Sequence, residues 1–192
     1  MELVDLYRRS QAEFTDRVRR IRPGQWSAAT PCRDWDVRAL VNHVVGEELW
    51  VVPLFDGATI AEVGDRFDGD LLGADPVQVA DEAADAAAAT VAEPGALTRT
   101  VHLSFGDTPA TEYVRQLLAD HLVHAWDLAV AIGAEPKLDP EAVASCAAWF
   151  TEREELYRQA GAIGARVPVP DGDEQARLIG AFGRDPAWRP TV

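Results

Sequence analysis

The chain has 192 residues, of which 47% are hydrophobic, and a formal net charge of −14. This length and composition favour one compact domain with a sizeable core. Nucleic acids and anionic membrane surfaces attract proteins through Lys and Arg, so we expect so acidic a chain to bind neither.

The cysteine content and the N-terminal residues bear on the cellular compartment. Cys32 and Cys146 are the two cysteines, too few for a disulfide scaffold. The first residues, MELVDLYRR, contain no apolar signal segment. The longest apolar run, at 49–55, is far too short to cross a bilayer. We therefore expect a cytoplasmic protein with reduced thiols.

Apolar residues recur at helical spacing in the first part of the chain. A first helix is predicted over 3–21. A second is predicted over 37–52, with Asp36 as its N-cap. The segment 56–75 is rich in Gly and Asp and is predicted as a long loop with a helical turn near 60–63. Loops of this length are uncommon unless they are functional or mobile.

A third helix and an extended segment are predicted next. The third helix covers 76–92 and is rich in alanine, which allows close helix approach. Apolar and polar residues alternate over 98–105, as in a short strand. The residues expected on its apolar face are Val101, Leu103 and Phe105. Gly106 and Asp107 are expected to turn the chain.

Two further helices and a short terminal helix complete the pattern. Thr108 and Pro109 are expected as N-cap and first residue of a fourth helix, which ends before Gly133. A fifth helix is predicted over 140–160 and a short one over 174–182. Together these elements indicate an all-α, up-and-down four-helix bundle with a short extended segment and a small C-terminal helix.

Two histidines and an aspartate are the candidate metal ligands. Asp120 and His124 stand four apart on the fourth helix, so their side chains share one face. His43 lies at the edge of the packed face of the second helix. If the helices pack together, two imidazoles and a carboxylate converge, which suits zinc, nickel or iron(II). Three protein ligands leave a position open for water or substrate.

Other readings of these residues stay open. A polar pair four apart on a helix is also typical of a surface contact or an Asp–His hydrogen bond. His121 is an alternative ligand, although we expect it to point off the shared face. Asp127 either orients an imidazole or makes a polar contact to a neighbouring helix. Glu47 is a candidate fourth ligand or general base, and its alternative is a surface glutamate.

A cysteine and several aromatic residues also have two interpretations. Cys32 is a candidate nucleophile, but no base is evident near it and a small buried hydrophobic residue is the preferred reading. His102, on the polar side of the extended segment, is expected to be exposed. Four tryptophans near the ligands in sequence either wall an apolar pocket or belong to the core, namely Trp26, Trp35, Trp50 and Trp126.

Three segments carry a resemblance to a known family. Residues 30–45, TPCRDWDVRALVNHVV, resemble the N-terminal signature of the mycothiol-dependent maleylpyruvate isomerase family, within the wider DinB-like metalloprotein group. Residues 120–129, DHLVHAWDLA, resemble its second signature. Residues 177–188, RLIGAFGRDPAW, are similar to the ending of an actinobacterial branch. The resemblance spans nearly the whole chain.

The resemblance implies a fold and a ligand set. It implies a DinB-like metal-binding helical bundle over 1–160, with a short C-terminal extension over 161–192 that packs on it. It places the ligands of a divalent metal on His43, Asp120 and His124. The isomerase has a glutamate where this chain has Asp120, and it carries a larger C-terminal domain.

The resemblance also implies thiol chemistry. The first hypothesis is a mycothiol-dependent transferase or isomerase acting on a small electrophile, with zinc as the expected metal and nickel as the alternative. Glu47 is its candidate catalytic residue. The second hypothesis is a non-catalytic metal-binding bundle acting as a sensor or interaction module. The third is a structural bundle in which His43 and Asp120 only hydrogen-bond. No sequence feature decides whether the chain forms a homodimer.

Overall fold

The computed structural model describes residues 2–190, and their regular structure is almost wholly helical. The α-helices are α1 (Leu3–Val18), α2 (Val37–Phe55), α3 (Ile60–Val63), α4 (Pro76–Val91), α5 (Ala110–Ile132), α6 (Pro140–Thr151), α7 (Glu154–Gln159) and α8 (Glu174–Ala181). The other elements are the 3-10 helices η1 (Pro23–Gln25) and η2 (Ala96–Thr98) and the strands β1 (Thr100–Leu103) and β2 (Gly106–Pro109). The all-α class expected from the sequence is confirmed.

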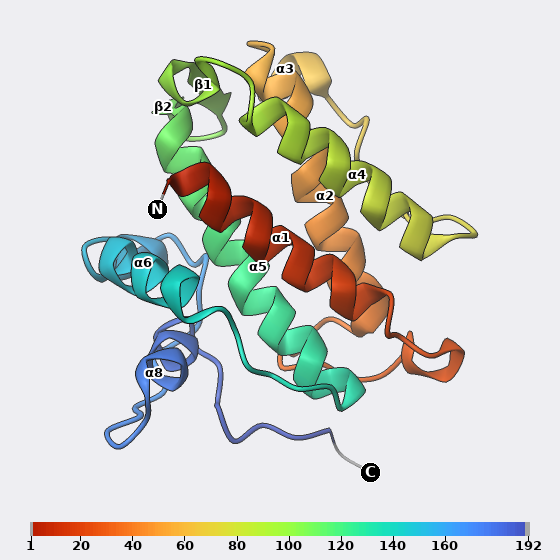
Figure 1. The fold of residues 1–192 in the computed structure, drawn as a ribbon, viewed down its shortest axis with the longest axis vertical. Coiled ribbons are helices and arrows are strands. Elements are labelled where there is room, and N and C mark those ends of the chain that lie inside the picture. The colour runs from red at the N-terminus through yellow and green to blue at the C-terminus, as the bar shows by residue number, and fades with distance from the viewer. Residues whose placement is uncertain (1, 191–192) are drawn as a thin grey trace.

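Four long helices, α1, α2, α4 and α5, form a bundle. Figure 1 shows α1 lying across α5, with α4 beside α2. The helices α6 and α8 contact each other and lie on the flank of α5 (Figure 1). The main core includes the buried side chains of Leu40, Val44, Leu118, Leu122 and Phe150. The predicted four-helix bundle with small additions is therefore confirmed.

Side-chain caps fix the start of most of these helices. The residues that accept hydrogen bonds from first-turn backbone N–H groups are Asp36, Thr59, Asp75, Asp139 and Asp173. Such caps satisfy donors that the helix itself leaves without partners. The other end of α5 is set by Gly133, whose φ of 72° is the left-handed conformation that favours glycine.

The first two helices differ slightly in length from the prediction. α1 ends at Val18 instead of residue 21. α2 continues past residue 52 to Phe55 although Pro53 lies inside it. Proline removes one backbone hydrogen bond, but Pro53 stands in the last turn, where little helix remains to be disrupted.

The extended segment is one half of a hairpin. β1 pairs antiparallel with β2, and Ser104 and Phe105 form the turn between them. The expectation that Gly106 and Asp107 turn the chain is therefore wrong, because both lie on β2. Phe105 is 70% exposed and does not share the buried side of Val101. Alternation in a sequence cannot show where a strand leaves the sheet.

The bounds of the fourth and fifth helices differ from those predicted from the sequence. Pro109 is the N-cap residue of α5, whereas Thr108 lies on β2 and donates its hydroxyl to a carbonyl of that strand. The predicted helix over 140–160 is two helices, α6 and α7. Between them, Arg153 leaves the ideal helical conformation and donates from Nε to Glu112 Oε1 of α5 at 2.7 Å.

The segment after α7 folds back against the bundle. Val167 N donates to the carbonyl of Gly180 at 2.9 Å. A Cβ atom at Gly180 would lie 2.5 Å from Val167 O, so this close approach requires glycine. Phe182 stacks on Phe150 of α6, with ring centroids 4.0 Å apart and an angle of 18°. The division into 1–160 and 161–192 remains a prediction.

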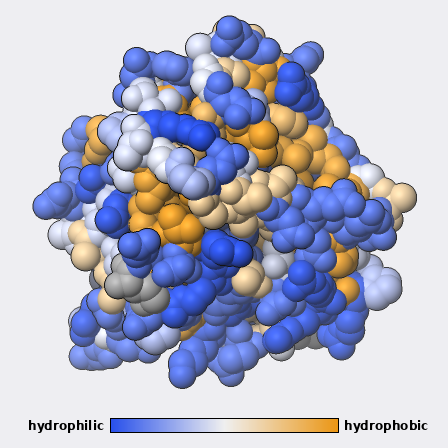
Figure 2. Space-filling view, turned by 45° about the horizontal axis from the view of Figure 1, so that its top comes forward, coloured by the Kyte–Doolittle hydropathy of each residue, from blue (hydrophilic) through white to orange (hydrophobic). Residues whose placement is uncertain are grey.

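The surface is polar over most of the face in Figure 2, with apolar residues visible in its central part. Two large apolar side chains in the described chain are mostly exposed, Phe105 on the hairpin and Leu156 on α7. Isolated exposed residues of this kind need no special explanation. Within 2–190, no helix combines the length and apolar character needed to cross a membrane.

The stacking of Phe182 on Phe150 predicts that Phe182→Ala lowers the free energy of unfolding by about 3 kcal/mol, the usual cost of truncating a buried phenylalanine. Urea denaturation followed by circular dichroism measures the change. Phe105→Ala is the matched control, because this phenylalanine is exposed and its loss should change the value by less than about 0.5 kcal/mol. Equal values for the two variants would contradict the prediction.

Candidate metal centre

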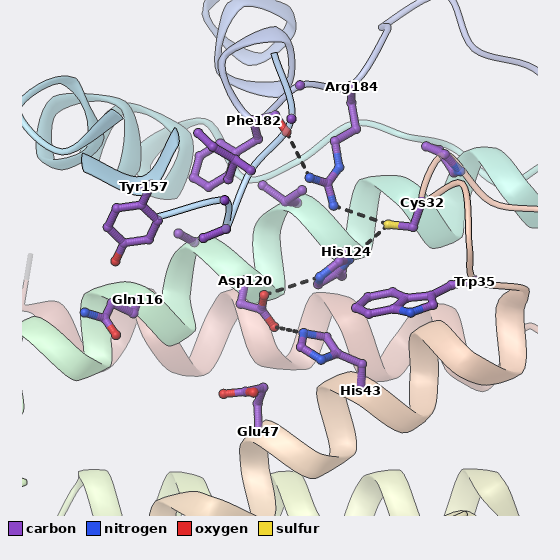
Figure 3. Close-up of a pocket in the computed structure, with 18 of the residues that line it drawn as sticks. Cys32, Trp35, His43, Glu47, Gln116, Asp120, His124, Tyr157, Phe182 and Arg184 are labelled. Atoms are coloured by element: carbon purple, nitrogen blue, oxygen red, sulfur yellow. Dashed lines mark hydrogen bonds and ion pairs between the residues drawn. The ribbon is translucent and has the colours of Figure 1, made fainter. Parts of the chain in front are cut away.

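A cavity of about 870 Å³ lies between α2, α5, the loop before α2 and the C-terminal segment. Each of these four parts contributes side chains to its wall (Figure 3). They include Cys32 and Trp35 from the loop, His43 and Glu47 from α2, Gln116, Asp120 and His124 from α5, and Phe182 and Arg184 from the C-terminal segment; Tyr157 of α7 adds a further side chain. The candidate ligands therefore face a space large enough for small molecules.

The structure brings His43, Asp120 and His124 together. His43 Nε2 lies 3.4 Å from Asp120 Oδ2, and His124 Nε2 lies 3.3 Å from Asp120 Oδ1. The rings of the two histidines are 5.1 Å apart and meet edge to face. The Asp120 carboxylate thus lies between the two imidazoles, as Figure 3 shows.

These distances fit a shared cation. Charge-assisted N–H···O bonds are usually about 2.7–2.9 Å long, shorter than both separations. The two separations end on different oxygens of the Asp120 carboxylate, and one ligand atom from each of the three side chains lies within 4.8 Å of the others, close enough to share one ion after small side-chain movements. Within residues 2–190, Asp120 Oδ2 is buried and has no hydrogen-bond partner. A metal between the three side chains would satisfy it.

A tryptophan forms one wall beside the ligands. The ring of Trp35 lies 4.6 Å from that of His43 and 5.7 Å from that of His124, between centroids. Trp126 is only 3% exposed and belongs to the core. Trp50 packs edge to face with Phe67 away from the site. Trp35 therefore lines the pocket, whereas Trp126 belongs to the core.

Asp127 holds the second nitrogen of His124. His124 Nδ1 lies 3.0 Å from Asp127 Oδ2, and the Asp127 side chain is fully buried. A carboxylate on the far nitrogen of a ligand histidine fixes the ring orientation and makes the other nitrogen available to the metal. Of the two roles expected for Asp127, the structure contains the contact that orients an imidazole.

Arg184 of the C-terminal segment completes this group. Its Nη2 donates to Asp127 Oδ2 at 3.1 Å and lies 3.3 Å from Cys32 Sγ. Cys32 Sγ lies 3.2 Å from Asp127 Oδ2, and the residue is half-buried at the cavity wall. Cys32 packs against the core, as expected of a small hydrophobic residue, but it is only half-buried and makes polar contacts. Cys146 is the buried cysteine, and burial raises the pKa of its thiol to about 12.

The role of Arg184 was not identified from the sequence. Its partner Asp127 is 57 residues away, and no local pattern links a short terminal helix to α5. The RLIGAFGRDPAW segment, which contains Arg184, was the one available signal.

A second group of side chains is also close enough to hold a metal, namely Cys32, His124 and Asp127. The guanidinium of Arg184 lies against the sulfur and the carboxylate of this group. A cation already occupies the position where a metal would be attracted. The geometry therefore favours the group formed by His43, Asp120 and His124.

The remaining candidates have clear positions. Glu47 lines the cavity on α2, so its reading as a surface glutamate is wrong. His121 points into the core, is 1% exposed, and contacts Glu48. His102 is partly exposed on the hairpin and lies 2.7 Å from Asp107 Oδ1, as expected for a residue outside the pocket.

Opposing effects shift the pKa values in the site. Burial opposes ionisation of Asp120, but His124 and His43 outweigh it and hold the pKa of this carboxyl well below its usual range. Burial also disfavours the charged form of His124, but Asp120, Asp127 and Cys32 raise its pKa well above the usual value. Burial and the charge of Asp120 raise the pKa of Glu47. Without a metal, Asp120 and His124 therefore form an ion pair.

Comparisons with known proteins connect this site to others. The family described as the mycothiol maleylpyruvate isomerase N-terminal domain matches residues 7–129, which include all three candidate ligands. Two proteins of Mycobacterium tuberculosis, one from each of two strains and both described as uncharacterized, are 34% identical over 142 residues, 73% of this chain and 73% of each relative. No solved structure matches the chain. Arg184 lies outside the matched domain.

The pKa shifts predict how Asp120→Asn changes stability with pH in metal-free protein. The pKa of His124 is raised in the folded protein. Protonated His124 therefore stabilises the fold fully below about pH 6.5, the pKa of a histidine in the unfolded chain, and less as pH rises. The lowered pKa of Asp120 stabilises it above about pH 3.9. The loss caused by Asp120→Asn should thus be greatest between about pH 4 and 6.5. Urea denaturation with a chelator present measures it, and a loss that stays constant up to pH 9 would contradict the assignment.

Proposed function

The chain belongs to the mycothiol maleylpyruvate isomerase N-terminal domain family, and from this premise we propose that it is a metal-dependent enzyme of thiol chemistry. His43, Asp120 and His124 hold a divalent metal, which we expect to be zinc, with nickel as the alternative. The co-substrate is a small thiol, mycothiol by family membership. The second substrate is a small electrophile, which undergoes transfer or isomerisation.

The convergence of two imidazole nitrogens on the Asp120 carboxylate is the observation that carries the proposal. The two nitrogen-to-oxygen separations of 3.3 and 3.4 Å are too long for strong hydrogen bonds, and one ligand atom from each side chain lies within 4.8 Å of the others. The ligands come from two helices and leave the side toward the cavity open. When bound there, a divalent metal would make a thiolate available at neutral pH.

The surrounding residues have separate tasks. Glu47 stands one helical turn after His43 on the same cavity wall, where its carboxylate can accept the proton that a bound thiol loses. Asp127 holds the orientation of His124. Trp35 shields the two imidazoles from water on one side.

The cavity supports catalysis over a sensor or interaction module. Its volume of about 870 Å³ lies in the upper part of the usual range for ligand pockets, so a thiol and an electrophile can be held side by side. Phe182 supplies an apolar surface, while Gln116 and Tyr157 supply polar groups. A site that only stored or sensed a metal would not need this space.

The proposal predicts that untagged protein binds about one zinc ion per chain and that His43→Ala weakens this binding by more than about 100-fold, since a lost ligand costs more than a lost outer-shell partner. Competition with a fluorescent chelator measures the affinity. Turnover of a chlorodinitrobenzene with mycothiol should fall in His43→Ala together with the zinc affinity.

The control is His102→Ala, which removes an imidazole of the hairpin that lies outside the cavity and should change neither measurement. Absence of zinc and nickel uptake by the wild-type protein would refute the metal centre. Metal uptake without any thiol-dependent turnover would favour the sensor or interaction module.

A further inference from the structure

The buried carboxylate of Glu48 lies where the four bundle helices meet. From α1, Tyr7 Oη donates to Glu48 Oε2 at 3.0 Å, and Gln11 Nε2 donates to the same oxygen at 2.8 Å. Gln11 also donates to the carbonyl of Ala84 on α4 at 2.9 Å. From α5, His121 Nε2 contacts Glu48 Oε1. The network around this carboxylate therefore connects all four helices, with Gln11 providing the link to α4.

This network lies apart from the cavity and has no task in the proposed chemistry. None of its four side chains lines the cavity. Each is at most 5% exposed, and Glu48 itself is 3% exposed. A carboxylate so deeply buried is destabilising unless polar groups compensate it, and an apolar core of the same shape is often at least as stable. Stability alone therefore gives no reason for its presence.

The position of the network relative to the metal centre suggests a reason for the buried carboxylate. In the described part of the chain, two polar contacts join α2 to α5, His43 with Asp120 and Glu48 with His121. His43 and Glu48 are about 7.5 Å apart along α2. His121 adjoins Asp120 and precedes His124 by three residues on α5. The second contact thus lies directly behind the candidate ligands.

Apolar packing alone would hold these helices less specifically. The hydrophobic effect is non-directional, so it does not by itself favour one alignment of polar groups on α2 and α5. A contact between a buried carboxylate and an imidazole depends on the positions of both groups, so it limits such shifts. Metal ligands must be held within about 0.5 Å of their working positions, and a supporting shell of locked side chains provides this precision.

We propose that Glu48 and His121 are positioning residues for the metal centre, which fix α2 against α5 so that His43 meets Asp120 and His124. The inference rests on the proposed metal site. Tyr7 and Gln11 hold Glu48 in place from α1, and Gln11 extends the connection to α4. The pair thus sets ligand geometry from inside the core, out of reach of substrate.

The test compares variants at two ends of the network. His121→Leu removes the contact between α2 and α5 and should weaken zinc binding by about 10- to 100-fold, as loss of outer-shell partners does. It should also shift the visible absorption of the cobalt-substituted protein, which reports ligand geometry. His121→Gln keeps an N–H donor toward Glu48 and should restore most of the affinity. Tyr7→Phe removes a bond to Glu48 but leaves the contact between α2 and α5.

Because Gln11 still donates to the same oxygen of Glu48, Tyr7→Phe should lower the melting temperature while zinc affinity and the cobalt spectrum change much less than in His121→Leu. Val91→Ala, a truncation in the separate core cluster beside η2, is expected to behave in the same way. If His121→Leu does not fold, Glu48→Gln replaces it, because the amide keeps the shape of the side chain and weakens the contact.

Wild-type affinity and spectrum in the folded variant of His121 or Glu48 would overturn the inference. Losses of zinc affinity in Tyr7→Phe and Val91→Ala as large as the loss in His121→Leu would overturn it too, because general loosening of the fold would then explain the effect. Failure of the wild-type protein to bind zinc or cobalt is a different result and would refute the metal centre itself.

Discussion

The Asp120 carboxylate lies between two imidazoles that come from different helices, and the packing of α2 against α5 makes this arrangement. The three side chains are too far apart for strong hydrogen bonds with one another and close enough to share a cation. One carboxylate charge, shared by two oxygens beside two imidazole nitrogens in a half-buried site, needs such a partner or a proton. The rest of the fold serves to hold this group and to leave space beside it.

Three structural layers hold the group in place. Beside it, Asp127 orients His124 and is itself held by Arg184 from the C-terminal segment. Behind it, the network around Glu48 connects the four bundle helices. Around it, the C-terminal segment forms one wall of the cavity and is anchored by the stacking of Phe182 on Phe150 of α6. The family match ends at residue 129, so the C-terminal wall of the cavity is a feature outside the matched domain.

The sequence predicted the helices well because the apolar periodicity and the N-caps are local signals. The convergence of His43 on α2 with the α5 residues followed from helical spacing and an assumed packing of two helices. The hairpin turn at Ser104 and Phe105 was missed, since alternation does not reveal where strands pair. The contact of Arg184 with Asp127 and that of His121 with Glu48 were missed because they join elements far apart in the chain. Such contacts depend on the tertiary fold and leave no local pattern.

X-ray absorption at the zinc edge of the loaded, untagged protein shows whether His43 and His124 bind the same ion. We expect a shell of nitrogen and oxygen neighbours at about 2.0 Å, with the outer scattering of two imidazole rings. A sulfur neighbour at about 2.3 Å would place the metal at Cys32 instead. A single imidazole, or none, would contradict the assignment of His43 and His124 to one ion.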